Sequence, residues 1–331
     1  MADETGVLVV GEIREGQLDS TTRELLSIGR KLADGVAQPL AAVLLGVNLG
    51  DPSREAIAYG AGKVFLAEHS FLAEGHPEVT VLALEQVCRQ VKPNIVLIAR
   101  TEAGRELGPR LAFRLGVGLA QDAVALGVDE NSKRLLITRP VYGGNAMAVV
   151  TLASAPQIAT VRPKVFEAAG KDQTLQGEVV RIAAEIPDSL RKVRMVQRVV
   201  EQGAGIKLDG ARVVVAGGRG LGGPEPFKEL EELAQVLGGA VGASRPACDG
   251  GWIDHGRQVG LTGKIVTPDL YIAVGISGAS QHMAGCSGAK LIVAINSDPE
   301  ANIFKEARYG AIGDWRKILP AFTETVRELL S

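Results

Sequence analysis

The sequence has few of the residues that build disulfide frameworks or metal sites. Among its 331 residues are only three cysteines, which lie far apart with no CxxC pair, and four histidines without metal-ligand spacing. An odd, scattered cysteine count is typical of proteins from a reducing compartment. We therefore expect no disulfide, no bound metal and a cytoplasmic location.

The sequence also lacks an excess of charge and a long apolar run. Lys and Arg total 36 and Asp and Glu total 38, so the net charge of −2 provides no field that would gather nucleic acid. The apolar runs are too short to cross a bilayer, and the N-terminal segment MADETGVLVVGEI carries acids where a targeting peptide carries bases. We predict a soluble protein that binds no nucleic acid and does not insert into a membrane.

Common hydrolase motifs are missing as well. The chain has no GxSxG elbow, no HExxH helix and no Walker lysine motif. Cys286 follows His282 by four residues, but one such pair on a helix face is more typical of packing than of a nucleophile and its base. The sequence therefore favours binding over hydrolysis.

The length and the apolar pattern predict two α/β domains, because domains usually hold about 100–200 residues. Short runs rich in Val, Ile, Leu and Ala alternate with stretches of helical period, the pattern of a parallel sheet covered by helices. In the first half, which we predict to be Rossmann-like, strands are expected over 6–13, 40–47, 64–67 and 94–98, and helices over 21–33, 53–59, 81–91 and 106–115.

From about residue 123 the pattern changes to closely spaced strands, which predicts a meander or an extension of the sheet. These strands are expected over 133–142, 146–152, 157–161, 178–186 and 193–200. The glycine-bearing stretch 201–205 then separates them from a new apolar strand. We place the domain boundary there and predict an N-terminal domain over 1–204 and a C-terminal domain over 205–331.

The C-terminal domain is predicted to be a second, doubly wound parallel α/β domain. Strands are expected over 211–216, 240–243, 270–274 and 291–295, and helices over 225–237 and 315–330. Two glycine-rich segments, GGRG at 217–220 and GISG at 275–278, each follow a strand. Such loops let backbone N–H groups approach a phosphate, although glycines also serve plain tight turns.

Polar side chains follow the strands of this domain. His282 is placed to donate to a ligand or, if protonated, to stabilise negative charge, and Arg245 is placed to stack on a ring or neutralise an anion. Asn296 and Asp314 stand where ribose hydroxyls are often recognised. Capping, packing and solvated loop charges are the alternatives for these residues.

Long, ordered segments resemble the electron transfer flavoprotein alpha subunit. They are SRPACDGGWI from Ser244, QVGLTGKIVTPDLYIAVGISGASQHMAG from Gln258, IVAINSDPEANIF from Ile292, YGAIGDWRKILPAF from Tyr309, GRELGPRLAFRLGVGLAQD from Gly104 and RPVYGGNAMAVV from Arg139. The resemblance covers nearly the whole chain. It implies an electron carrier rather than a stand-alone enzyme, with FAD in the C-terminal domain and a beta subunit as partner.

The resemblance also implies the path of the electrons. They would come from flavin dehydrogenases, such as the acyl-CoA dehydrogenases of fatty acid β-oxidation, and pass to a membrane quinone oxidoreductase. Arg245, Thr262 and His282 would tune the flavin, with Arg245 against the ring and contributing most. The cofactor-binding residues would be Arg219, Ser244, Arg245, Val259, Gly260, Leu261, Thr262, Ser277, Gly278, Ala279, Ser280, Gln281, His282, Asn296, Asp314 and Trp315.

The sequence departs from the family pattern at Leu261, where many relatives have glutamine. Unlike glutamine, leucine cannot donate a hydrogen bond to the flavin. Two other functions remain open at this point. One is the alpha subunit of an electron-bifurcating, NADH-oxidising complex with a second FAD. The other is a regulatory or structural subunit whose glycine loops hold an adenine nucleotide.

Overall fold

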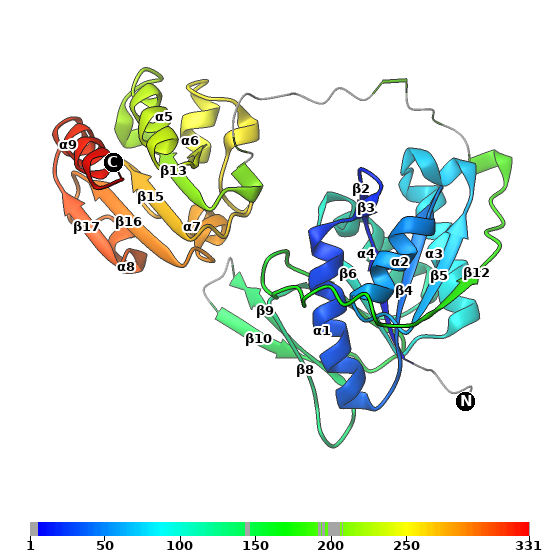
Figure 1. The fold of residues 1–331 in the computed structure, drawn as a ribbon. Coiled ribbons are helices and arrows are strands. Elements are labelled where there is room, and N and C mark those ends of the chain that lie inside the picture. Colours follow the sequence, from blue (N-terminus) through cyan, green and yellow to red (C-terminus); the bar gives the residue numbers. More distant parts are fainter. Residues whose placement is uncertain are drawn as a thin grey trace. The chain divides into compact units, whose positions relative to one another are not determined.

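The computed structural model describes residues 6–142, 146–190, 193, 196–197, 206 and 208–330 (Figure 1). Contacts within the chain divide these residues into two compact units, one over 6–141 and 146–190 and the other including 208–330. The predicted boundary at residues 204 and 205 lies outside the described residues and stays a prediction.

The N-terminal unit is built on a seven-stranded sheet in which neighbouring strands are parallel. Its strand order is β12 (Glu178–Arg181), β5 (Lys63–Glu68), β4 (Leu40–Gly46), β1 (Val7–Gly11), β6 (Ile95–Ala99), β11 (Gln157–Val161) and β7 (Leu119–Ala123). A small hairpin of β2 (Ile13–Arg14) and β3 (Gln17–Leu18) follows β1, so the first predicted strand ends earlier than expected.

Helices cover both faces of this sheet. They are α1 (Ser20–Val36), α2 (Gly50–Ala58), α3 (Pro77–Val91) and α4 (Glu102–Leu115). Val7 and Val9 of β1 pack in one cluster with α1 and α2, whereas Leu8 packs on the opposite face with α3 and α4. Asp19 caps α1, as its position predicts, because its carboxylate accepts a hydrogen bond from the Thr21 N–H at 3.0 Å.

The predicted strand-rich extension divides into two parts. The strands β8 (Ala125–Val128), β9 (Leu135–Val141) and β10 (Ala146–Val150) form a separate antiparallel meander. By contrast, β11 and β12 enter the parallel sheet, where every residue of β11 is buried. The predicted strand over 178–186 is shorter than expected, and the one over 193–200 lies largely outside the described residues.

The C-terminal unit is a five-stranded parallel sheet with helices on both faces, which confirms the predicted fold class. Its strand order is β14 (Ala240–Ala243), β13 (Val213–Gly217), β15 (Leu270–Val274), β16 (Leu291–Asn296) and β17 (Tyr309–Ile312). The clusters place α7 (Ser280–Cys286) and α8 (Ile303–Glu306) on one face, and α5 (Phe227–Val236), α6 (Arg245–Asp249) and α9 (Trp315–Leu330) on the other.

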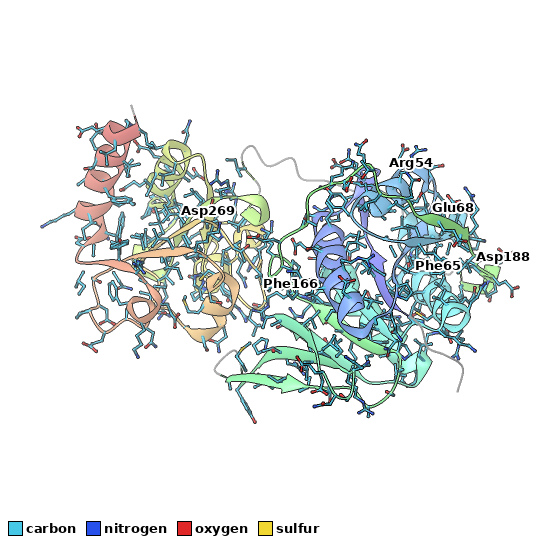
Figure 2. The ribbon with its side chains drawn as sticks, turned by 60° about the horizontal axis from the view of Figure 1, so that its bottom comes forward. Arg54, Phe65, Glu68, Phe166, Asp188 and Asp269 are labelled. Carbon is cyan, nitrogen blue, oxygen red and sulfur yellow. The ribbon has the colours of Figure 1, made fainter. Side chains whose placement is uncertain are left out.

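Ion pairs connect the amino ends of three strands in this unit. Asp269, labelled in Figure 2, directly precedes β15 and contacts the side chains of Arg212, before β13, and Lys290, before β16, at 2.7 and 3.0 Å. Hydrogen bonds from Lys290 and Arg212 lower the pKa of Asp269. These ion pairs link the amino ends of β13, β15 and β16 to one another.

No helix among the described residues is long and apolar enough to cross a membrane. Within the same described ranges, no group of three or more His, Cys, Asp or Glu side chains is arranged to hold a metal ion. Cys88, Cys248 and Cys286 are buried free thiols.

A partly buried ion pair connects β7 and β11 near their carboxyl ends. The Arg162 guanidinium donates two hydrogen bonds to Asp122, at 2.9 and 2.7 Å, and Arg100 lies 3.5 Å from the same carboxylate. Burial alone would raise the pKa of Asp122, but Arg162 and Arg100 outweigh burial and lower it. The pair is therefore charged at neutral pH and adds a side-chain link to two strands that are already neighbours in the sheet.

We expect Asp122→Asn to lower the free energy of unfolding by about 1–3 kcal/mol at pH 7, because two charge-assisted hydrogen bonds lose their acceptor charge. The lowered pKa means that this stabilisation is present above the unfolded value near 3.9 and is lost as the pH falls through the native value. Urea unfolding at pH 7 and near pH 3 measures the difference. Asp34→Asn, which removes an exposed ion pair with Arg30, is the control and should change stability by less than about 1 kcal/mol. Equal losses in the two variants would contradict the assignment.

Candidate ligand-binding site

The strand order of the C-terminal unit reverses beside β13. After β13 the chain moves to β14 on one side and then crosses to β15 on the other, so the loops that follow β13 and β15 leave the sheet in opposite directions. In open α/β sheets, ligands bind outside the carboxyl ends of the strands at this kind of reversal. Both glycine-rich segments predicted from the sequence begin here.

Backbone contacts join the two glycine-rich loops. The Gly218 N–H donates to the Val274 carbonyl at 2.9 Å, and the Gly220 N–H donates to the Gly275 carbonyl at 3.0 Å. A Cβ on Gly218 would lie 2.2 Å from the Gly275 oxygen, and Gly275 itself has φ +64°. Only glycine at Gly218 permits this approach without displacing backbone. The glycines are therefore required for the close contact between the loops as well as for the turns.

A cavity of about 640 Å³ opens beside these loops, within the usual range of about 300–1,000 Å³ for cofactor sites. It contains most of the predicted site residues, from five separate segments of the chain. The predicted residues that line it are Arg219, Ser244, Arg245, Val259, Gly260, Leu261, Thr262, Ser277, Ala279, Gln281, His282 and Asn296.

Four predicted residues do not line the cavity. Gly278 has φ +81°, and a Cβ there would lie 2.2 Å from the Ile303 nitrogen, so it shapes the loop. Ser280 begins α7 and contacts the neighbouring Gln281 side chain. Asp314 accepts a hydrogen bond from the Arg316 N–H at 3.0 Å, at the start of α9. Trp315 packs with the core, and its Nε1 has no hydrogen-bond partner among the described residues.

The sequence prediction also missed residues that line the cavity. They are Gly220, Pro246, Gln258, Gly275, Ile276, Asp298 and Ala301. Gln258 is the most informative of them, because its Nε2 donates to the Thr262 hydroxyl at 3.0 Å and holds the two ends of the 258–262 turn together. The sequence offered two indications, its position directly before predicted site residues and its place at the start of the QVGLTGK segment.

The Arg245 side chain is held in an ion pair with Asp249. It begins α6, and its Nε donates to the Asp249 carboxylate one turn later at 3.2 Å. Two-thirds of the Arg245 side chain is exposed, so the guanidinium remains accessible at the cavity. Asp249, which the sequence prediction did not include, therefore orients the principal cation of the site.

His282 is buried, with an exposed fraction of 7%. Burial lowers its pKa to about 4, and an interaction with the Val259 backbone only partly offsets this effect. The imidazole is therefore neutral at pH 7, which leaves hydrogen bonding as its role. Its Nε2 lies 2.9 Å from the Tyr271 hydroxyl, whereas its Nδ1 has no hydrogen-bond partner among the described residues.

These groups suit a ligand that carries acceptor atoms and an apolar ring. Two residues lining the cavity, Ser244 and His282, each have a buried polar atom that lacks a partner within the described part of the chain. Such atoms are costly unless a ligand or water satisfies them. Arg245 adds positive charge, and Val259, Leu261 and Ile276 add apolar surface. The residues present therefore fit a flavin nucleotide.

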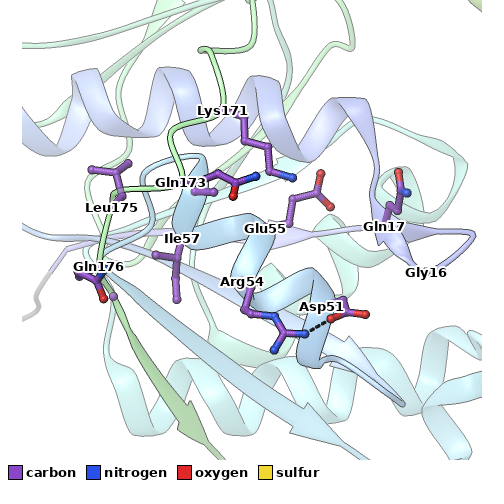
Figure 3. A pocket seen from close by; sticks show the side chains of 12 residues that line it. Gly16, Gln17, Asp51, Arg54, Glu55, Ile57, Lys171, Gln173, Leu175 and Gln176 are labelled. Atoms are coloured by element: carbon purple, nitrogen blue, oxygen red, sulfur yellow. Dashed lines mark hydrogen bonds and ion pairs between the residues drawn. The ribbon is translucent and has the colours of Figure 1, made fainter.

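A second hollow, of about 560 Å³, lies in the N-terminal unit and contains no predicted site residue. Figure 3 shows its side chains, which come from the β2–β3 turn, α2 and the 171–177 segment. Arg54 and Asp51 pair with each other there and are largely exposed. Unlike the C-terminal cavity, this hollow is lined by no residue with a buried polar atom that lacks a partner in the described part of the chain, so it is the weaker candidate.

Comparison with known proteins agrees with this choice. Residues 7–187 match the family model described as "Electron transfer flavoprotein domain", and residues 207–287 match "Electron transfer flavoprotein FAD-binding domain". The electron transfer flavoprotein subunit alpha of Thermoanaerobacterium thermosaccharolyticum is 42% identical over 330 residues, which cover 99% of this chain and 100% of the relative.

Two further relatives are informative. The electron transfer flavoprotein subunit alpha of Bacillus subtilis is 44% identical over 329 residues, 98% of each chain. Subunit LctC of the lactate dehydrogenase (NAD(+),ferredoxin) of Acetobacterium woodii is 38% identical over 316 residues, which cover 95% of this chain and 75% of the relative.

We expect Gly218→Ala to separate the joined loops, because its Cβ would overlap the Gly275 carbonyl. The variant should lose about 1–3 kcal/mol of stability, as overpacked sites usually do, and should release its FAD on desalting. Gly210→Ala, where a Cβ would meet nothing within 4 Å, is the matched control. Chemical unfolding and the flavin absorbance of desalted protein measure both effects, and full flavin retention by Gly218→Ala would contradict the role of the contact.

Proposed function

The chain belongs to the electron transfer flavoprotein alpha-subunit family and binds FAD, and from that premise we propose that the cavity beside β13 and β15 holds the cofactor. Paired with a beta subunit, the protein then carries electrons from flavin dehydrogenases, such as acyl-CoA dehydrogenases, to a membrane quinone oxidoreductase. The observation that supports this proposal best is the meeting of the tethered Arg245, neutral His282 and two glycine-rich loops around one cavity.

FAD supplies an isoalloxazine ring that accepts and releases electrons one or two at a time. The chain's own residues set the surroundings of that ring. Arg245 stabilises added negative charge more than it stabilises the neutral ring, and so raises the reduction potential. His282, being neutral, contributes a hydrogen bond rather than a full charge. Gln258 holds the Thr262 hydroxyl in place at the same cavity.

The remaining residues lining the cavity bind the rest of the cofactor. Arg219 and Ser277 supply a cation and a hydroxyl donor suited to phosphate, and Asn296 and Asp298 suit ribose hydroxyls. Asn296 is already oriented, because its side-chain nitrogen donates to the Ile276 carbonyl at 2.9 Å. Leu261, 39% exposed at the cavity, offers only apolar contact, so the polar contact made by glutamine in many relatives is replaced by packing.

The partner and the compartment are part of the proposal. The alpha-subunit family implies a beta subunit, which would complete the electron carrier. Three buried free thiols are consistent with a reducing compartment, and we place the protein in the cytoplasm.

A second candidate function is supported by one relative. LctC belongs to a complex whose name includes both NAD(+) and ferredoxin, so an electron-bifurcating complex that oxidises NADH is the alternative. That function requires a second FAD, which would be bound mainly by the partner subunit.

We expect the chain, co-expressed with its neighbouring beta subunit, to purify as a yellow heterodimer with one FAD that NADH does not reduce. Visible absorption, flavin release and titration with NADH test this. Two FAD per heterodimer with reduction by NADH would replace the simple carrier with the bifurcating complex. A colourless heterodimer would overturn the electron-carrier proposal and favour a nucleotide-binding subunit.

We expect Arg245→Ala to lower the midpoint potential of the bound FAD by roughly 30–60 mV, because one stabilising charge is lost and 59 mV corresponds to about 1.4 kcal/mol for one electron. Arg212→Ala removes the same charge at the opposite end of the sheet and should leave the potential unchanged. Spectroelectrochemistry of the heterodimer measures both variants. An unchanged potential in Arg245→Ala would remove Arg245 from the redox role.

A further inference from the structure

Tyr271 lies beside the cavity and was not among the predicted site residues. It belongs to β15 and is completely buried. Its hydroxyl lies 2.9 Å from His282 Nε2, and the two ring centroids are 6.1 Å apart. A buried phenolic hydroxyl needs a hydrogen-bond partner, and His282 provides one.

We propose that Tyr271 is a positioning residue, whose hydroxyl donates to His282 Nε2 and so keeps the imidazole proton on Nδ1, where it serves as a donor for the FAD site. The part concerning FAD rests on the proposed function above. The part concerning the imidazole proton does not, because it concerns this chain alone.

The direction of the hydrogen bond follows from the groups around the hydroxyl. Tyr271 keeps its proton, because burial first and Cys286 second raise its pKa well above 10. The hydroxyl has two neighbouring acceptors, the imidazole nitrogen of His282 and the sulfur of Cys286. A thiol sulfur is a weak acceptor, and the Cys286 thiol already donates toward the His282 carbonyl at 3.6 Å. The imidazole nitrogen therefore takes the Tyr271 proton.

The direction of this hydrogen bond also decides which imidazole nitrogen of His282 carries the hydrogen. In a neutral imidazole, one nitrogen accepts and the other carries the hydrogen. With Nε2 accepting from Tyr271, the hydrogen is on Nδ1, which makes no hydrogen bond of good geometry in the described ranges, although the Val259 backbone interacts with the imidazole. A buried donor left unsatisfied costs about 1–3 kcal/mol, and an acceptor atom of the cofactor recovers that cost.

Tyr271, His282 and Cys286 lie close in the sequence and interact with one another in the structure. Tyr271 lies on β15, the loop after β15 forms part of the cavity, and His282 and Cys286 lie one turn apart on α7. The same segment therefore forms the loop beside the ligand and fixes the donor that faces it. A phenylalanine at Tyr271 would preserve the packing and remove only the hydroxyl.

The test uses the heterodimer with ¹⁵N-labelled histidine and records long-range ¹H–¹⁵N correlations, with the His282 signals assigned by their loss in His282→Gln. We expect His282 to carry its proton on Nδ1 in the unmodified protein. In Tyr271→Phe we expect this single form to give way to a mixture of both tautomers. The dissociation constant for FAD should rise about five- to tenfold, the effect of one hydrogen bond.

Tyr309→Phe is the matched control, because Tyr309 lies on β17 of the same unit and is 61% exposed. It should change neither the tautomer nor FAD binding. A proton on Nε2 in the unmodified protein would overturn the proposal, even if Tyr271→Phe fails to fold. An unchanged tautomer in a folded Tyr271→Phe would overturn it as well. If the heterodimer holds no FAD but His282 is protonated on Nδ1, the electron-carrier function fails while the positioning role of Tyr271 stands.

Discussion

The C-terminal unit depends on the close backbone contact between the loops that follow β13 and β15. Gly218 and Gly220 donate to carbonyls of the neighbouring chain segment, and neither Gly218 nor Gly275 tolerates a side chain at that distance. The contact holds the two loops together at the strand-order reversal, where a sheet of this type leaves an opening. The other site residues lie around these two joined loops.

Among the described residues lining the cavity, Arg245 is the cation whose side chain is both accessible and paired with a neighbouring carboxylate. Arg245 is fixed by Asp249, whereas burial keeps His282 neutral. A neutral donor and a cation affect a redox cofactor differently, because the cation interacts with net charge while the donor interacts with one atom. The hydrogen bond from Tyr271 lets the buried His282 side chain supply that donor while it remains uncharged.

The N-terminal unit follows the same sheet physics, and its hollow of about 560 Å³ is similar in size to the C-terminal cavity but contains no predicted site residue. Its hollow is bordered by exposed side chains, including the Arg54–Asp51 pair. Its strands β7 and β11 are held instead by the partly buried Asp122–Arg162 pair. Buried polar atoms without a partner occur in both units, but among the described residues those of Ser244 and His282 line a cavity, which points to the C-terminal unit as the binding unit.

The sequence by itself determined the fold class, because apolar periodicity and glycines at strand ends are local patterns, and its resemblance to the electron transfer flavoprotein alpha subunit implied most of the residues lining the cavity. It also determined the α1 cap at Asp19, which depends on adjacent residues only. Tertiary structure decided that β11 and β12 join the parallel sheet, since strand pairing between distant segments leaves no local pattern. It alone decided the neutral state of His282, its bond to Tyr271 and the tether between Arg245 and Asp249. Burial and side-chain direction arise only when strands and helices pack.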